Sequence, residues 1–386
     1  DFSQSALIPV GGTPMTPPTL TVADLLPTDQ VSISGLSFDL VVPHIFISKT
    51  YGIRIDNCDG RVVLSDLRVE RGASPGTTGG AVTVTNSGQV LFSSCEFEGF
   101  MTMPSFQYPG NQSAVTPGLY VSNSSVTVNN CSIKGASGFF GSFFTPQDQS
   151  SSGPAIWADT STVRVSRSTL VGGNGGAFSD LFGAHVTDAG PALAALDSNV
   201  YVRGAVSDLL GGAGQFLTAS STGLGAPAIA IYGSTLMTIT SDVQVAAGAN
   251  GVGGTTTSLL FATGPFHFFP IGEPLASMEI TPSTVTLGNN LTLDLAGPPS
   301  APFLGYFSFG LGDSFKVQGL LGAVVLDLNA YAALPPQVLD GAGHRQLHLT
   351  IPALPSLVGS SIFAQGITAS GQGTLSISAP TMVSIR

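Results

Sequence analysis

The charged side chains that could perform catalysis gather in one short segment, which contains Arg54, Asp56, Asp59, Asp66 and Arg68. Carboxylates brought together from adjacent strands could hold Ca²⁺, and a positively charged arginine would lie beside them. A pair of carboxylates is also what the cleavage of a glycosidic bond requires. The alternative is a solvated charged edge near one end of a domain, and we favour this interpretation. The sequence therefore predicts no catalytic residue.

The histidines give no pattern for a metal site. His44, His185 and His267 are isolated in the chain. His344 and His348 would share one face of a strand, but about 13 Å apart along it, which is too far for one metal ion. We also find no nucleophile elbow, phosphate-binding loop or zinc-ligand spacing. We therefore expect neither a metal ion nor a cofactor.

The composition argues against several classes of protein. The chain has 12 Lys and Arg against 23 Asp and Glu, a net charge of −11, which argues against binding to nucleic acid or to an anionic membrane. No apolar run approaches the roughly 18 residues that would span a bilayer, so we expect no membrane insertion. The acidic, glycine-rich composition suits an exported bacterial protein, and DFSQSALIPV would fit a mature N-terminus left after removal of a signal peptide. We therefore expect the protein outside the cell or on its surface.

One motif recurs along the chain. GPAIWADTSTVRVSRSTLVGGNGG, residues 153–176, is followed about 37 residues later by GPALAALDSNVYVRGAVSDLLGGAGQ, residues 190–215. Alternating apolar and polar residues, with many β-branched side chains and glycines, indicate strands and not helices. Two series of strands keep this spacing. The first aligns Ile55, Val84, Val121, Ala158, Ala195 and Ile231, and the second aligns Leu64, Phe92, Val128, Val165, Val202 and Ile239.

The repeat predicts an all-β chain in which residues 31–270 form a parallel β-helix of about six to seven coils. Each coil would contain two short strands, a turn between them and a third segment that returns to the start. A sharp corner repeated in every coil requires residues that tolerate the left-handed conformation. Five of the six residues found two positions after the first series tolerate it, and the six are Asn57, Asn86, Asn123, Thr160, Asp197 and Gly233.

The same alignment separates the cysteines. Cys58 falls in the first turn, whereas Cys95 and Cys131 both end the second strand. We expect Cys95 and Cys131 to be neighbours inside the helix as buried free thiols. A disulfide or a metal site is less favoured, because Ser168 and Ala205 take the same position in later coils and neither is a thiolate ligand.

Long loops would connect each double glycine to the next coil, and all of them would leave from one corner of the rod. Loops of this length are uncommon unless they bind something. Two interpretations stay open: the loop aromatics form a contact surface, or they form a second small core that packs the loops onto the rod. These aromatics are Phe106, Tyr108, Phe139, Phe140, Phe143, Phe144, Phe178, Phe182 and Phe216.

Both ends of the chain depart from the repeat. Residues 1–30 are rich in proline and are predicted to form an extended arm that contacts a neighbouring subunit through Leu7, Ile8, Val10, Leu20 and Val22. Longer alternating strands without the repeat follow Pro270, so residues 271–386 are predicted to form an antiparallel β-sandwich. A rod with a sandwich at one end could also stack head to tail.

Two segments resemble known families. GPAIWADTSTVRVSRSTLVGGNGG resembles the right-handed parallel β-helix repeat family of exported bacterial proteins, which implies a right-handed helix in a fold shared by enzymes, adhesins and fibres. The stretch from Leu287 through AGPPSAPFLGYFSFG to LDGAGHRQLHLTIPALPSLVGSSIFAQG resembles the sandwich module at the end of many bacterial surface proteins. Pectate lyases and polygalacturonases form the enzyme branch of the helix family. This chain lacks the NTD, DD and GHG motifs, and Arg54-Ile55-Asp56 only half-matches RIK.

These observations predict an extracellular structural protein, a self-assembling surface or filament subunit without catalytic activity. Low charge, a rigid rod and a proline-rich arm all suit assembly. The expected partner is a second copy of the chain, in a homo-oligomer or homopolymer. The alternatives are a glycan-binding adhesin that uses the loop aromatics and, third, a polysaccharide lyase or hydrolase.

Overall fold

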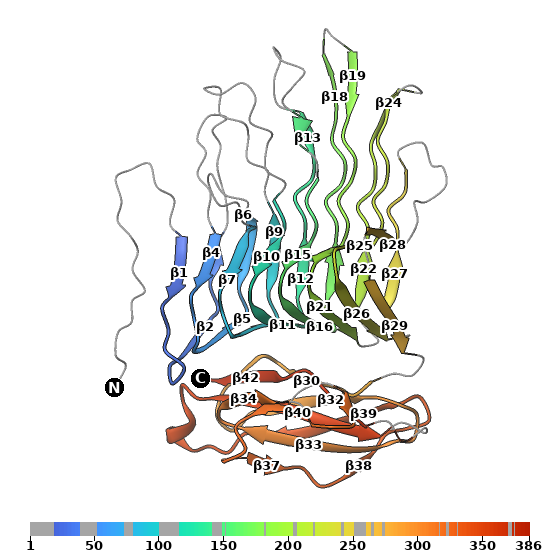
Figure 1. Ribbon diagram of the computed structural model, residues 1–386. Coiled ribbons are helices and arrows are strands. Elements are labelled where there is room, and N and C mark those ends of the chain that lie inside the picture. Colours follow the sequence, from blue (N-terminus) through green and yellow to red (C-terminus); the bar gives the residue numbers. More distant parts are fainter. Residues whose placement is uncertain are drawn as a thin grey trace, which may run out of the picture.

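The computed structural model describes residues 19–38, 52–72, 80–99, 116–140, 149–150, 152–180, 183–203, 207–218, 221–240, 243–250, 260–263, 266–271, 275–315, 317–321, 324–329, 331–369, 373 and 375–386. These residues are all-β, apart from one 3-10 turn, η1 (Pro355–Leu357). Figure 1 shows a rod of stacked strands, with hairpins that project from one side and a second β domain on the opposite side. The rod is a parallel β-helix, as the repeat predicted.

Three parallel sheets run along the rod, and successive coils contribute strands to each. Sheet A contains β1 (Thr19–Ala23), β4 (Gly52–Asp56), β7 (Val82–Thr85), β10 (Leu119–Ser122), β15 (Ile156–Asp159), β20 (Leu193–Leu196), β25 (Ile229–Tyr232) and β28 (Leu260–Thr263). Sheet B contains β2 (Gln30–Ser34), β5 (Arg61–Ser65), β8 (Gln89–Ser93), β11 (Ser125–Asn129), β16 (Thr162–Ser166), β21 (Asn199–Arg203), β26 (Thr235–Thr240) and β29 (Phe266–Ile271). Sheet C, the returning segment of each coil, contains β3 (Ser37–Phe38), β6 (Arg68–Gly72), β9 (Glu96–Gly99), β12 (Ser132–Lys134), β17 (Thr169–Val171), β22 (Asp208–Leu210) and β27 (Gln244–Ala246).

The register of sheets A and B confirms the alignment of the repeats. In sheet A, parallel pairing runs without a break through Ile55, Val84, Val121, Ala158, Ala195 and Ile231. In sheet B it runs through Leu64, Phe92, Val128, Val165, Val202 and Ile239. These residues point inward, so apolar side chains of successive coils stack in continuous rows.

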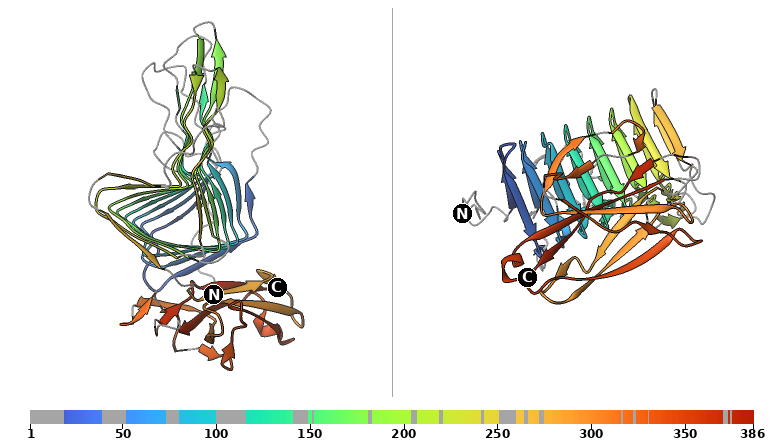
Figure 2. Two further views of the ribbon diagram at one scale, coloured as in Figure 1. Left: turned by 90° about the vertical axis from the view of Figure 1, so that its right-hand side faces the viewer. Right: turned by 90° about the horizontal axis from the view of Figure 1, so that it is seen from below.

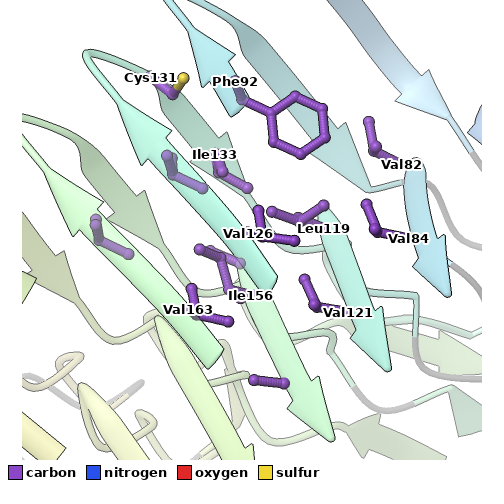
Figure 3. Packing of buried hydrophobic residues seen from close by; sticks show 14 of the residues in the cluster. Val82, Val84, Phe92, Leu119, Val121, Val126, Cys131, Ile133, Ile156 and Val163 are labelled. Carbon is purple, nitrogen blue, oxygen red and sulfur yellow. The ribbon is translucent and has the colours of Figure 1, made fainter. Parts of the chain in front are cut away.

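The interior of the helix is filled by these rows. Figure 3 shows Leu119, Val126 and Ile133 of one coil pointing toward one another from sheets A, B and C. All three have no exposed surface. Burying one such side chain stabilises the folded state by about 1.5–3 kcal/mol. Apolar packing along the rod is therefore the main source of stability in a chain of which only 9% of the residues are charged.

The corner between sheets A and B is made by residues with positive φ, as predicted. All the residues named for this corner adopt the left-handed conformation, with φ of 54° at Asn57 and 47° at Asn123. Thr160 has φ of 49°, although a β-branched side chain is strained there. Side-chain amides connect the coils on the outside of the corner, where Asn123 Nδ2 donates to Asn86 Oδ1 at 3.0 Å.

A ladder of hydroxyl and thiol groups lines the inside of the same corner. Its members are Cys58, Ser87, Ser124, Ser161, Ser198 and Thr235. Each backbone N–H donates to the side chain of the next member, at distances from 3.0 to 3.3 Å. The side chains donate in turn to carbonyls of their own coil, so these buried polar groups are satisfied. Cys58 thus lies in the first turn, as predicted.

Cys95 and Cys131 are neighbours in a second ladder, at the corner between sheets B and C. The N–H of Cys95 donates to Cys131 Sγ at 3.3 Å, and both thiols are free and buried. Burial raises the pKa of the Cys95 thiol, so it stays protonated. The ladder continues through Ser168 to Ser207, and the expected Ala205 is wrong. The reason is that this coil is longer than the preceding one, which shifts the corner along the sequence.

The first strand corrects part of the predicted N-terminal arm, residues 1–30, of which the structure describes residues from 19 onward. β1 pairs in parallel with β4, with Val22 opposite Ile55. Leu20 and Val22 are each only 8% exposed to solvent and belong to the core of the helix. They are therefore not free to contact another subunit. The corner after β1 and the segments between coils differ in length from one coil to the next. A strand can therefore keep the register of the sheet while it departs from the 37-residue spacing.

At its other end the helix closes with β29 at Ile271, next to the predicted bound at residue 270. Residues 260–263 were expected in a loop, but they form β28, which pairs with β25. β29 pairs with β26 in the same coil. Sheets A and B therefore each contain eight strands, more than the six to seven coils expected.

Antiparallel hairpins leave the helix at the corner between sheets C and A. They are β13 (Phe139–Phe140) with β14 (Gln149–Ser150), β18 (Ala177–Asp180) with β19 (Gly183–Val186), and β23 (Phe216–Thr218) with β24 (Ser221–Thr222). The hairpins pack beside one another and form a projection that stands away from the rod (Figures 1 and 2). The prediction that these segments leave from one corner is confirmed for the described residues, but the sequence did not predict that they form strands.

Glycines stack where the projection meets the rod, because the outgoing and returning segments interleave there. Gly153, on a returning segment, donates its N–H to Ala136 O at 2.8 Å, and Gly173, on the next outgoing segment, donates to Gly153 O at 2.9 Å. The pattern continues through Gly190 and Gly212. A Cβ atom at Gly173 would overlap the Ala136 carbonyl. This close crossing explains why the repeat begins with Gly-Pro and ends with a double glycine.

The C-terminal domain is a β-sandwich, as predicted. One sheet is antiparallel and contains β30 (Ser277–Thr281), β32 (Asn290–Ala296) and β39 (His344–Thr350). The other contains β31 (Thr284–Val285), β33 (Pro302–Ser308), β35 (Leu320–Leu321), β37 (Tyr331–Ala333), β38 (Gln337–Val338), β40 (Ser361–Ala369), β41 (Leu375–Ile377) and β42 (Thr381–Ile385). This second sheet is mixed, because β31 pairs with β42 and β35 with β41 in parallel. A hairpin of β34 (Leu311–Phe315) and β36 (Val324–Leu326) completes the domain.

The sandwich packs against the rod on the side of sheet B (Figure 2). Val63 and Leu91 point outward from sheet B and are buried against Leu311, Phe363 and Met382 of the sandwich. An apolar cluster of this kind excludes water from the junction. The two domains therefore share a small core of their own.

Polar contacts surround this shared core. The Asp66 carboxylate accepts hydrogen bonds from the hydroxyls of Ser283 at 2.7 Å and Thr284 at 3.3 Å. Arg167 forms an ion pair with Glu279, and the two side chains are 17% and 12% exposed to solvent, respectively. Burial raises the pKa of the Glu279 carboxyl, and Arg167 opposes that rise. The junction is thus held by buried charge as well as by apolar packing.

Candidate functional site

The structure describes few of the residues predicted to contact a partner. Those outside the described residues are Leu7, Ile8, Val10, Phe106, Tyr108, Phe143, Phe144 and Phe182. The backbones of Phe139, Phe140 and Phe178 lie in β13 and β18 of the projection, while their side chains fall outside the description. Both interpretations of the loop aromatics therefore stay predictions.

The charged residues considered for catalysis do not converge. Arg54 pairs with Asp56 at 2.7 Å on the outward face of sheet A. The hydrogen bond from Thr85, aided by Arg54, lowers the pKa of Asp56. Asp66 lies at the next corner and binds the sandwich, and Arg68 lies on sheet C. A substrate at any one of these positions would therefore meet only part of the set.

The two histidines of the sandwich lie on one strand. His344 and His348 are exposed on β39, and His348 Nδ1 lies 3.2 Å from the Thr292 hydroxyl. Among the residues that the structure describes, no three His, Cys, Asp or Glu side chains could together hold a metal ion.

A groove lies where Arg167 meets the antiparallel sheet of the sandwich, with a volume of about 410 Å³. Several of its polar groups already bond within the protein. Gln346 donates to Asp294 at 2.7 Å, and Asp340 accepts the N–H of His344 at 2.8 Å. Arg167 Nε is buried without a hydrogen-bond partner among the described residues, but the Arg167 guanidinium already pairs with Glu279, so the groove offers a ligand little that it does not already give to the fold.

The strongest candidate for a binding site is an aromatic row on the outward face of sheet A, which consists of Tyr120, Trp157, Tyr232 and Phe261. Tyr120 and Trp157 occupy the same outward position in adjacent coils. The rings of Trp157 and Tyr232 have centroids 6.0 Å apart and planes 22° from parallel. The Phe261 ring lies 6.0 Å from Tyr232, tilted by 60°. The row follows the axis of the rod.

Two alanines explain how these rings meet. Ala194 and Ala230 occupy the outward positions between Trp157 and Phe261. Only 1% of the surface of Ala194 and 2% of that of Ala230 is exposed to solvent, although both residues lie outside the interior core. Coils are about 4.8 Å apart, so rings two coils apart can approach closely only by leaning over the small residues between them. Phe261 stays 46% exposed at the end of the resulting apolar surface.

The electrostatic surroundings of the row are acidic. Asp159 lies two residues after Trp157, and Asp197 lies at the adjoining corner, where it accepts the Ser234 N–H at 2.7 Å. No Lys or Arg occurs in the strands of sheet A from β10 to β28 or in the corner residues that follow them. Burial raises the pKa of Tyr232, so its hydroxyl stays protonated and can both donate and accept. The row therefore combines apolar rings with hydrogen-bond acceptors at its rim.

This site was not predicted from the sequence, because the candidate residues were drawn from the loops and the N-terminal segment and only the inward positions of the strands were aligned. The signal was present in the outward positions of the aligned repeats. Trp157, the only tryptophan in the chain, is followed in register by two alanines and then by Phe261. A large residue beside small ones on a solvent face indicates a surface that is shaped for contact.

Comparisons with known proteins give little further information. No protein-family model matches the chain, and no curated protein matches it. Among solved structures, the chain is similar to Pantoea stewartii WceF, described as a glycan biofilm modifying enzyme with a bacteriophage tailspike-like parallel beta-helix fold. The identity is 9%, the TM-score is 0.16, and the match covers 95% of this chain and 49% of that chain, so this chain spans about half of its length. No helix among the described residues is long and apolar enough to cross a membrane.

Proposed function

We propose that this protein is an extracellular glycan-binding protein without catalytic activity, and that the aromatic row on sheet A is its binding surface. The proposal rests on one observation. The rings of Trp157, Tyr232 and Phe261 contact one another over Ala194 and Ala230, and both alanines are buried. The rings are large apolar groups held on a rigid sheet that faces solvent. The glycan-binding role, second among the expectations from sequence, is thereby assigned to a different surface from the loops.

A sugar ring suits such a surface because one of its faces carries mainly C–H groups while its rim carries hydroxyls. Aromatic rings bury the C–H face and release water from both surfaces. Asp159 and the Tyr232 hydroxyl lie beside the rings and can bond the hydroxyls of the sugar. Because pairing on both sides fixes the strands that carry Tyr120, Trp157 and Tyr232, little order has to be gained there on binding.

Truncation of the tryptophan tests the proposal. We expect Trp157→Ala to weaken glycan binding roughly tenfold to a hundredfold, as removal of a central aromatic anchor does at binding surfaces. Binding to an array of immobilised glycans and then titration calorimetry with the best ligand would measure the change. Tyr331→Ala is the matched control, because Tyr331 is a 52% exposed aromatic on the sandwich.

Unchanged glycan binding by Trp157→Ala would contradict the assignment of the site. Sedimentation of the same variants identifies the competing explanation, in which the row is a contact between subunits. A native oligomer that dissociates in Trp157→Ala but binds no glycan would replace the proposal with that explanation.

The second candidate function is a self-assembling structural subunit. The observation that favours it is that β1 and β28 end sheet A, and each has a hydrogen-bonded neighbour on one side only among the described strands. Edge strands of this kind can pair with another chain. If the helix stacks head to tail, electron microscopy of the purified protein should show filaments, and a field of separate particles at every concentration would count against this role.

A further inference from the structure

We infer that the aromatic row selects glycans that lack acidic groups and binds polymers with free amino groups most tightly. This inference rests on the proposed function, since it names the class of glycan that the same surface would take. It is carried by the charges around the row and not by the rings, which would stack on a sugar of any charge.

The charged groups on this part of sheet A all have one sign. Asp159 points outward beside Trp157, and Asp197 lies exposed at the corner of the next coil. Arg54 is the base nearest along the sheet, and it is already paired with Asp56 at 2.7 Å, two coils before Tyr120. From β10 to β28 the strands and their corner residues contain no Lys or Arg. A glycan on the rings would therefore lie next to carboxylates without a compensating cation.

An acidic polymer meets two costs on such a surface. Each uronate carboxylate would approach Asp159 and Asp197 at short range, and like charges across an interface oppose binding. The polymer would also approach a protein with a net charge of −11, which slows encounter at low ionic strength. Neither cost applies to a neutral glycan.

An amino sugar gains from the same two carboxylates. Its ammonium group can pair with Asp159 or Asp197 while the ring stacks on Trp157 or Tyr232. Asp159 already accepts the Thr160 hydroxyl at 3.0 Å through one oxygen, so its second oxygen is the one available to a ligand. The pairing is exposed to solvent, so we expect a modest gain that weakens as salt is added.

The test compares three hexamers: β-1,4-linked glucosamine, its N-acetylated form with the same backbone, and galacturonate. In mildly acidic buffer of low ionic strength, which keeps the amino groups of glucosamine protonated, we expect glucosamine to bind about three- to tenfold more tightly than the N-acetylated hexamer, and the galacturonate hexamer to bind at least tenfold more weakly than either. Asp159→Asn should remove most of the preference for the amino form and leave binding of the N-acetylated hexamer unchanged. Asp327→Asn, in the sandwich, is the control and should change neither.

The outcomes separate this inference from the proposed function. Galacturonate binding that equals or exceeds the others, and that is lost in Trp157→Ala, would overturn the charge selection and leave glycan binding in place. Glucosamine binding that persists undiminished in Trp157→Ala would overturn the inference, because attraction by charge alone would then be enough. If no hexamer and no glycan of the array binds in a Trp157-dependent manner, the proposed function fails, and this inference fails with it.

Discussion

We expect Gly173→Ala to lower the free energy of unfolding by about 3 kcal/mol or more, the upper range for adding atoms to a packed interior. The new Cβ would overlap the carbonyl of Ala136, and that atom belongs to the backbone and cannot turn aside. Gly173 also donates its N–H to Gly153 O at 2.9 Å and accepts from Gly190 N at 2.8 Å. Relief of the overlap would therefore break the hydrogen bonds that join three segments.

Thermal unfolding followed by circular dichroism would measure this loss. Hydrogen exchange would show whether the projection opens first, as its place beyond the glycine stack suggests. Gly341→Ala is the matched control, since a Cβ at Gly341 would have nothing within 4 Å and Gly341 does not have positive φ. It should change stability by no more than about 0.5 kcal/mol. Equal stability of the two variants would show that the segments do not cross as closely as described.

The second large effect is expected at the junction of the two domains. Arg167→Met should destabilise the native protein by about 2–3 kcal/mol, somewhat below the 3–5 kcal/mol typical of a fully buried pair because both side chains keep some exposure. The variant leaves the Glu279 carboxylate buried beside Asp294 without its cation. Urea denaturation would measure the loss without the screening that a salt denaturant introduces.

The double variant Arg167→Met with Glu279→Leu provides the control. It removes both charges, so it should recover most of the stability that the single variant loses. If the double variant is as unstable as the single one, loss of packing and not unpaired charge is the cause.

The penalty in Arg167→Met should also depend on pH. Burial and Asp294 raise the pKa of Glu279 above its ordinary value of 4.5, and Arg167 lowers it, so removal of Arg167 raises it further. A carboxyl whose pKa is raised in the folded state takes up a proton more readily when folded than when unfolded. Stability therefore increases as the pH falls through the folded-state pKa. The difference between Arg167→Met and the native protein should be largest at neutral pH and shrink in acid.

The course of the helix could be predicted from the sequence because parallel stacking repeats one local rule in every coil. An inward residue at one position demands an apolar residue at the same position of the next coil, so two series of strands recorded the register directly. The corner imposes a similarly local demand. It accepts only residues that can hold positive φ, and Asn57, Asn86 and Asn123 indicate this by type alone. Cys95 and Cys131 were placed correctly for the same reason.

Prediction was less successful where segments of variable length separate the repeated positions. Leu20 and Val22 were assigned to an arm because they break the 37-residue spacing, yet pairing of β1 with β4 depends on register in the sheet and not on spacing in the chain. Ser207 was missed in the same way, since added residues at a corner shift the sequence without moving the ladder. The strands of the projection were missed because the segments between coils were expected to be loops, whereas each of them pairs its own outgoing and returning parts.

By itself, the sequence determined which residues point into the rod, where its first corner turns and where the sandwich begins, because each follows from local alternation or backbone preference. Only the tertiary structure decided what the outward residues do. Trp157 and Tyr232 lie far apart in the chain, and their rings meet at 6.0 Å because the one coil between them places the small Ala194 beside Trp157, and Ala230 precedes Tyr232 on its own strand. Likewise, the ion pair between Arg167 and Glu279 depends on how the sandwich packs against sheet B. Such contacts depend on how the coils stack and how the two domains pack, and the spacing of residues in the sequence does not show which outward side chains come together.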